Sequence, residues 1–260
     1  MGASIEMNIS GKLARIWLNR PEVFNSFNRE MALLLQEKLA ACEENDQVKA
    51  VLISGRGKAF CAGQDLKEVT TPELNPGFKK ILEEHYNPII KQIRKLSKPV
   101  VAAVNGVAAG AGANIALACD LVIATEGASF IQAFSKIGLV PDSGGTFFLP
   151  RLIGFQKASA LMMLGDKVSA REAQEMGMIY QCVAAEEFEQ TAVKLAEKLS
   201  LMPTQALAYT KDLLNQSMNN NLDAQLDMES RLQIASAQSE DYAEGVAAFI
   251  EKRKPNFVGK

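Results

Sequence analysis

Short apolar runs alternate with longer amphipathic stretches along much of the chain. The apolar runs are typical of buried strands, and two short strands are expected around the turn signal Ser10-Gly11-Lys12. The expected strands cover residues 4–18, 48–54, 100–104, 121–124, 128–130 and 179–183. The expected helices cover residues 28–44, 78–96, 155–164 and 169–175, and Asn28 is in position to cap the first of them. This alternation predicts an α/β core.

The pattern changes after Ala185, where almost every stretch has helical periodicity. Helices are expected over residues 186–200, 203–217, 222–238 and 240–251. No linker, low-complexity run or repeat separates this part from the rest. We therefore expect a core over residues 1–197 and a helical C-terminal region over residues 198–260, of a kind that often packs on a neighbouring subunit or covers a site.

The stretch 101–120 (VAAVNGVAAGAGANIALACD) combines an apolar strand, a turn at Asn105-Gly106, a segment of small residues and a helix. Small side chains let a ligand approach the backbone closely. The first N–H groups of a helix lack internal partners and carry partial positive charge, so they suit an oxygen that becomes negative during a reaction. Close packing of the helix on the strand explains the same residues and stays open as an alternative.

The composition excludes several classes of protein. The chain has 260 residues, a net charge of −2, 48% hydrophobic residues and 22% charged residues, which is ordinary for a globular protein with a sizeable core. Neither a basic stripe for nucleic acid nor an apolar run long enough for a membrane is present. Four cysteines without CxxC spacing are typical of reduced thiols, so we expect a cytoplasmic protein without a disulfide framework or a zinc site.

A single histidine, His85, limits the possible chemistry further. A metal site with several histidines cannot be built, and a Ser-His-Asp triad would have to use this residue. Because His85 lies in a stretch with helical periodicity, it is interpreted as a surface or packing residue.

Five segments together resemble the enoyl-CoA hydratase/isomerase (crotonase) family. They are residues 18–22 (LNRPE), 60–66 (FCAGQDL), 99–106 (PVVAAVNG), 110–120 and 138–145 (GLVPDSGG). Their order and spacing fit over nearly the whole chain. The resemblance implies a spiral of ββα units with a helical trimerisation region, acyl-CoA thioester substrates, and assembly as a homotrimer or a hexamer. It implies no separate cofactor, since coenzyme A is part of the substrate.

The resemblance also implies roles for individual residues. The backbone N–H groups of Gln64 and Ala111 match the two donors of the family's oxyanion hole. The implied substrate and CoA contacts are Arg20, Val23, Ala62, Asp65, Leu66 and Phe134, with Phe257 and Lys260 reaching a CoA on the next subunit. Removal of a proton next to a thioester puts negative charge on the carbonyl oxygen, and loss of one such donor typically costs ~3–4 kcal/mol.

The reaction class depends on three positions. Hydratases of the family use two glutamates to split water, and the matching residues here are Asn114 and Phe134, neither of which can act as a base. Asp142 matches the position where several isomerases carry their acid/base carboxylate. An Asp before Ser-Gly-Gly at a helix start is also a common N-cap, so that alternative is open on the residues alone.

Within the family, further segments resemble isomerases of bacterial phenylacetate degradation. They are residues 85–90 (HYNPII), 105–113, 133–142 and 241–246, with Lys252 and Arg253. We therefore predict an acyl-CoA isomerase that uses Asp142. The implied reactions are conversion of the ring-1,2-epoxide of phenylacetyl-CoA to an oxepin-CoA and shift of an enoyl-CoA double bond. A hydratase, and a non-catalytic acyl-CoA-binding subunit, are the alternatives.

Overall fold

The larger of two sheets contains six strands. The structure is a computed structural model that describes residues 2–260. The sheet order is β1-β2-β3-β5-β7-β10, with β1 antiparallel to β2 and the other pairs parallel. The strands are β1 Ile5–Ser10, β2 Leu13–Leu18, β3 Ala50–Gly55, β5 Val100–Val104, β7 Leu121–Thr125 and β10 Gln181–Val183. Every residue of β5 is buried, as expected for a central parallel strand whose two faces are covered.

The second sheet contains four short strands. Its order is β4-β6-β8-β9, and its strands are β4 Ala59–Cys61, β6 Val107–Ala109, β8 Ser129–Ile131 and β9 Lys167–Ser169. Strands β3, β5 and β7 are each followed directly by a strand of this sheet and then by helices. A Cβ at Gly106 would lie 2.1 Å from the carbonyl oxygen of Lys58, so glycine is needed where β5 gives way to β6. The repeated unit is therefore strand, strand, helix.

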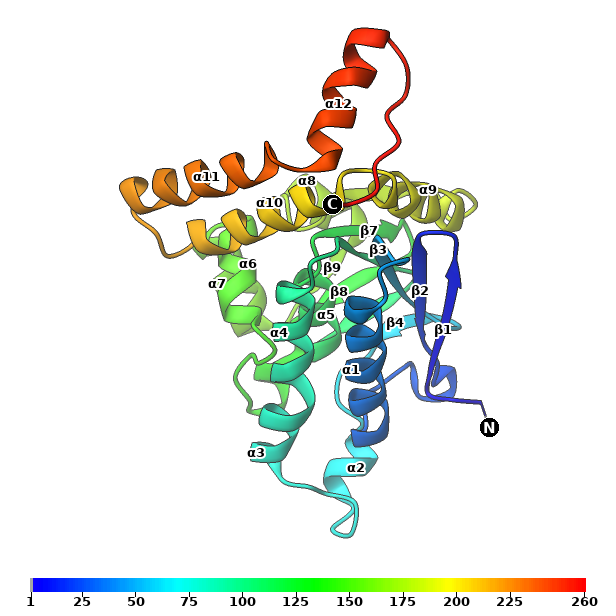
Figure 1. The fold of residues 1–260 in the computed structure, drawn as a ribbon. Helices are drawn as coiled ribbons and strands as arrows, with labels where there is room; N and C mark the ends of the chain where they lie inside the picture. Colours follow the sequence, from blue (N-terminus) through cyan, green and yellow to red (C-terminus); the bar gives the residue numbers. More distant parts are fainter. Residues whose placement is uncertain (1) are drawn as a thin grey trace.

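Helices surround the sheets (Figure 1). Those of the core are α1 Arg29–Glu44, α2 Leu66–Thr70, α3 Phe78–Lys80, α4 Asn87–Lys95, α5 Ala111–Leu117, α6 Gly145–Ile153, α7 Phe155–Leu164, α8 Ala170–Glu175 and α9 Phe188–Ser200. Short 3-10 helices cover Pro21–Val23 and Ala133–Ile137, and a π-helical segment, Ile81–Tyr86, joins α3 to α4. The Asn28 side chain accepts a hydrogen bond from the Met31 N–H at the start of α1, so the predicted cap is confirmed.

Three helices form the C-terminal region, namely α10 Thr204–Ser217, α11 Leu222–Ser236 and α12 Glu240–Glu251. Figure 1 shows α12 projecting away from the sheets and the last residues running back beneath it. The buried Asp241 carboxylate accepts hydrogen bonds from the Val258 and Gly259 N–H groups, which fixes this returning segment. Within residues 2–260, none of the helices has the length and apolar character needed to cross a membrane.

A charged cluster attaches α10 to the core. The Asp120 carboxylate, just before β7, lies 3.1 Å from the Arg94 guanidinium and 2.9 Å from Lys211 Nζ of α10. It also accepts a hydrogen bond from the Val100 N–H. Desolvation lowers the pKa of the buried Lys211, and the neighbouring Asp120 opposes that shift. The anion therefore has partners from α4, β5 and α10.

Most predicted elements are present, but the short ones differ. The three-residue strands β4, β6 and β9 and the five-residue helix α2 are not among the expected elements. The helix expected over residues 78–96 consists of two α-helical pieces and the π segment. His85, in that segment, is 1% exposed, so its interpretation as a packing residue is confirmed and a surface position is wrong.

Candidate active site

Two chain segments meet at the end of the small sheet. Because β4 and β6 are parallel neighbours, the residues that follow them lie side by side. Gly63, with a φ of 92°, approaches the second segment so closely that a Cβ there would lie 3.0 Å from the Ala109 carbonyl oxygen and 3.6 Å from the Ala111 nitrogen. The segments that carry Gln64 and Ala111 are therefore in direct contact.

The backbone N–H groups of Gln64 and Ala111 donate no hydrogen bond within residues 2–260. Ala111 is the first residue of α5, where an N–H has no helical partner. On either side of Gln64, the Gly63 carbonyl accepts from the Phe27 N–H at 2.7 Å and the Asp65 N–H donates to the Phe27 carbonyl at 2.8 Å. The amide of Gln64 is thus held between two backbone hydrogen bonds and remains unused itself.

Asp142 lies in the loop before α6, and its side chain does not cap that helix. The N-cap residue is Gly144, with no side-chain capping hydrogen bond. The chain turns through left-handed conformations at Ser143 (φ 51°) and Gly144 (φ 74°) before the helix begins. A left-handed conformation is unusual for a serine and is typical of functional loops. The interpretation of Asp142 as an N-cap is therefore wrong.

The carboxylate of Asp142 is half-buried and has one hydrogen-bond donor within residues 2–260, the Ser143 hydroxyl at 2.8 Å. Burial raises the pKa of Asp142 above its ordinary value, and the Ser143 hydroxyl partly offsets this by stabilising the charged form. A carboxylate with a raised pKa and free lone pairs can accept and return a proton.

Asn114 contacts the backbone of this loop, and Phe134 lies beside the start of α5. Asn114 Nδ2 donates to the Asp142 carbonyl oxygen at 2.8 Å, and Gln132 Nε2 donates to Asn114 Oδ1 at 2.8 Å. The Phe134 ring lies beside Gly110, where a Cβ would be 3.7 Å from its Cζ. Asn114 thus holds the Asp142 loop against α5, a role that the sequence did not reveal.

Two of the predicted CoA contacts, Arg20 and Asp65, form an ion pair. Arg20 Nη2 lies 2.8 Å from Asp65 Oδ2, and Arg20 Nη1 donates to the Ser26 carbonyl. Asp65 also caps α2 by accepting from the Lys67 N–H at 3.0 Å. The remaining members of this group are Val23, which is half-buried, and Ala62 and Leu66, which are exposed.

Phe257 and Lys260 lie in the returning C-terminal segment. The Phe257 carbonyl accepts from Lys12 Nζ at 2.9 Å, and the Lys260 carbonyl accepts from the Asp241 N–H at 3.1 Å. Their contact with CoA on a neighbouring subunit stays a prediction.

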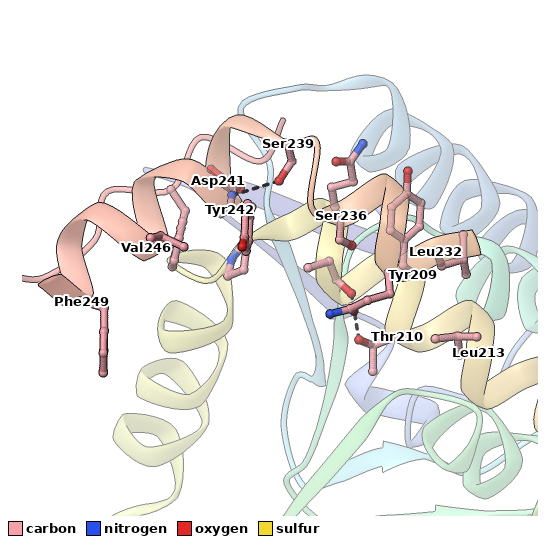
Figure 2. A pocket seen from close by; sticks show the side chains of 16 residues that line it. Tyr209, Thr210, Leu213, Leu232, Ser236, Ser239, Asp241, Tyr242, Val246 and Phe249 are labelled. Atoms are coloured by element: carbon pink, nitrogen blue, oxygen red, sulfur yellow. Dashed lines mark hydrogen bonds between the residues drawn. The ribbon is translucent and has the colours of Figure 1, made fainter. Parts of the chain in front are cut away.

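Two hollows bear on substrate binding. An apolar groove of about 380 Å³ runs beside Pro141, and its lining includes Leu139, Val140, Phe155 and Met163. A larger hollow of about 550 Å³ lies among α10, α11 and α12. Figure 2 shows it between Tyr209 of α10, Leu232 of α11 and Phe249 of α12. Since no residue of the Gln64, Ala111 or Asp142 segments lines the larger hollow, the groove is the one that adjoins the candidate site.

Comparison with known proteins decides the family. A sequence profile described as enoyl-CoA hydratase/isomerase matches residues 8–260. The chain belongs to the enoyl-CoA hydratase/isomerase family. Its ββα spiral is the crotonase fold, so the expected fold class is confirmed.

Relatives within the family carry both isomerase and hydratase names. The chain is 47% identical to the 1,2-epoxyphenylacetyl-CoA isomerase of Escherichia coli (strain K12), over 94% of each chain. It is 43% identical to the "Probable enoyl-CoA hydratase" of Rhodobacter capsulatus, over 99% of this chain and 98% of that one. A crystal structure of an enoyl-CoA hydratase from Bacillus anthracis superposes with a TM-score of 0.92 at 32% identity, covering 99% of this chain and all of that one.

Proposed function

We propose that the protein is an acyl-CoA isomerase in which Asp142 transfers the proton. The observation that carries this proposal is the state of Asp142, a half-buried carboxylate with a raised pKa that caps no helix. Asn114 and Phe134 occupy the positions where the family resemblance expects the two glutamates of a hydratase. Since neither side chain can activate water, these residues favour isomerisation over hydration.

For an enoyl-CoA, the Asp142 carboxylate would remove a proton from one carbon of the acyl chain. The electron pair moves into the conjugated system, and the thioester carbonyl oxygen becomes negative. The Gln64 and Ala111 N–H groups would stabilise this oxygen by donating hydrogen bonds. Protonated Asp142 then returns the proton to a different carbon, so the double bond shifts and no atom is gained or lost.

The substrate with most support is the ring-1,2-epoxide of phenylacetyl-CoA, which is an isomer of the oxepin-CoA product. The relative at 47% identity is named for this substrate. The apolar groove beside Pro141 and the Phe134 ring also suit a flat, apolar acyl group. Coenzyme A is part of the substrate, and the proposed chemistry requires no further cofactor.

The CoA portion would lie along the segments that carry Arg20, Val23, Ala62, Asp65 and Leu66. The ion pair between Arg20 and Asp65 joins these two segments, so it would shape the CoA site even without direct contact. Phe257 and Lys260 of a neighbouring subunit would complete the site in an oligomer.

A homotrimer or a hexamer is the proposed assembly. Apolar side chains of α12, among them Phe249 at 85% exposure, project from the C-terminal region. A second exposed apolar group, including Leu222 and Ile234, lies on α11. Two different apolar surfaces on one chain are what a closed, head-to-tail ring requires.

The test compares Asp142→Asn with the wild-type protein, using 3-enoyl-CoA and ring-epoxide-CoA thioesters and mass spectrometry or absorbance as readout. We expect the variant to lose at least 100-fold in double-bond shift while acyl-CoA affinity stays within twofold. Asp166→Asn, at an exposed position, is the matched control.

Full activity of Asp142→Asn would overturn the proposal, and rapid hydration of crotonyl-CoA by the wild-type protein would favour a hydratase. Tight acyl-CoA binding without turnover of any thioester would favour a non-catalytic binding subunit.

A further inference from the structure

The Gln64 side chain is held at both ends of its amide group. Its Oε1 accepts a hydrogen bond from the Tyr86 hydroxyl at 2.9 Å, and its Nε2 donates to Glu68 Oε2 at 2.7 Å. Because the side chain is fully engaged in this way, the backbone N–H is the donor that Gln64 has left for a ligand.

Tyr86 is suited to a permanent donor role. Its side chain is 1% exposed, and burial raises the pKa of its hydroxyl well above the ordinary value, so the group keeps its proton. Its ring packs against Phe27, with 6.0 Å between ring centroids. Phe27 is also the residue whose backbone pairs with Gly63 and Asp65, so it contacts both the main chain of the loop and the ring of Tyr86.

Glu68 supplies the second support. It is 8% exposed, and its other carboxylate oxygen accepts the Arg29 N–H at 2.7 Å. The Arg29 guanidinium in turn lies 3.1 Å from His85 Nε2. Since a guanidinium can only donate, Nε2 of His85 is the acceptor, in agreement with desolvation lowering the pKa of His85 and favouring its neutral form.

The π-helical segment Ile81–Tyr86 carries both Tyr86, which bonds to Gln64, and His85, which lies beside Arg29. Its wider turn places His85 and Tyr86 in succession on the buried side. Short π-helical turns inside helices are frequent at functional sites.

We propose that Tyr86 is a positioning residue, which together with Glu68 clamps the Gln64 side chain and thereby aims the Gln64 backbone N–H at the thioester oxygen. This inference rests on the proposed function, in which that N–H is an oxyanion donor. A misaligned donor stabilises developing charge poorly, so the clamp should affect kcat more than substrate binding.

The first test is a double-mutant cycle with Tyr86→Phe and Gln64→Met, the second of which keeps the backbone N–H and the side-chain length. We expect Tyr86→Phe to lower kcat about tenfold with KM within twofold. In the Gln64→Met background, the same change should alter kcat by less than twofold. An equal loss in both backgrounds would overturn the proposal, because it would trace the effect to ring packing. Tyr180→Phe, at a 59% exposed position, is the matched control.

The second test does not depend on turnover. Hexanoyl-CoA labelled with ¹³C at its carbonyl carbon should show a downfield shift on binding to the wild-type protein, because hydrogen bonds polarise the carbonyl. Tyr86→Phe and Gln64→Met should each reduce this shift, whereas Asp142→Asn should keep it. An unchanged shift in Tyr86→Phe, or no shift in the wild-type protein, would overturn the clamp. Loss of the proposed isomerase activity alone would leave this measurement intact, so the two failures are distinguishable.

Discussion

The Nδ2 atom of Asn114 lies 2.8 Å from the carbonyl oxygen of Asp142. Asn114 stands three residues after Ala111 in α5, so one helix carries a candidate oxyanion donor and also fixes the backbone of the candidate base. Proton transfer and charge stabilisation require the two groups to keep a constant separation. A single rigid element connecting them meets this requirement.

Replacing Asn114 by alanine should therefore reduce activity and stability together. The change leaves the buried Gln132 Nε2 without its acceptor and opens a cavity at a position with no solvent exposure. We expect the free energy of unfolding to fall by ~1–3 kcal/mol and kcat to fall about tenfold. Urea denaturation and steady-state kinetics measure these effects, with Asn219→Ala at an exposed position as control. If the variant is destabilised but its kcat is unchanged, Asn114 has no role in placing Asp142.

Asp142→Asn should make the protein more stable at neutral pH. The folded-state pKa of Asp142 is raised above 3.8, so the folded protein binds this proton more tightly than the unfolded chain. Stability therefore decreases as pH rises through the window from 3.8 to the raised value, and the full penalty is present above that window. Asparagine carries no charge and can still accept from the Ser143 hydroxyl.

The measurement is the melting temperature of both proteins between pH 4.5 and pH 8. For a domain of this size, 1 kcal/mol corresponds to about 2–4 °C in melting temperature. We expect the advantage of the variant to be largest at the alkaline end and to shrink toward pH 4.5. A variant that melts below the wild type at pH 7 contradicts the assigned burial of the carboxylate.

Ser143→Ala should shift the pH dependence of the reaction. The Ser143 hydroxyl lowers the pKa of Asp142 by donating to its carboxylate, so removal of the hydroxyl raises that pKa further. As the base must be ionised, the acidic limb of kcat/KM should move to higher pH while the plateau changes less than threefold. If the acidic limb stays in place in the alanine variant, the pH profile does not report the ionisation of Asp142.

Lys211→Met should weaken the attachment of α10. The ammonium group is 7% exposed and bonds to the Asp120 carboxylate, which keeps Arg94 and the Val100 N–H as partners after the change. Because the anion is still partly compensated, we expect a loss of ~1–3 kcal/mol in the free energy of unfolding. Lys194→Met, at an exposed position, should change it by less than 0.5 kcal/mol. Equal values for the two variants in urea denaturation would show that the cluster contributes little.

The long elements could be predicted because their periodicity extends over many residues. Helices such as α1 and α7 repeat an apolar face over several turns, and β5 is an uninterrupted apolar run. Strands β4 and β9 contain three residues each, too few to establish a period, and exist because neighbouring strands pair with them.

The site could be predicted only in part for a related reason. The family resemblance indicated Asp142, Gln64 and Ala111 as positions in the sequence. The left-handed turn at Ser143 that keeps the Asp142 side chain off the helix is a tertiary feature with no local signature, since serine rarely adopts it. The bond from Tyr86 to Gln64 likewise depends on a π-helical turn and spans 22 positions of the chain.

The π-helical segment has a consequence for insertions and deletions in the gene. A π turn holds one residue more than an α turn would need, so deleting a codon within residues 81–86 would let the helix become regular and rotate α4 by about 100° relative to α3. Ile89, Ile90 and Ile93 would then leave the core that they now fill. The exposed connection over residues 72–77 lies only a few positions earlier. It does not set the rotation of a helix, so it should accept a change in length. Insertions and deletions in functional descendants of this chain should therefore occur in residues 72–77 and be absent from residues 81–86.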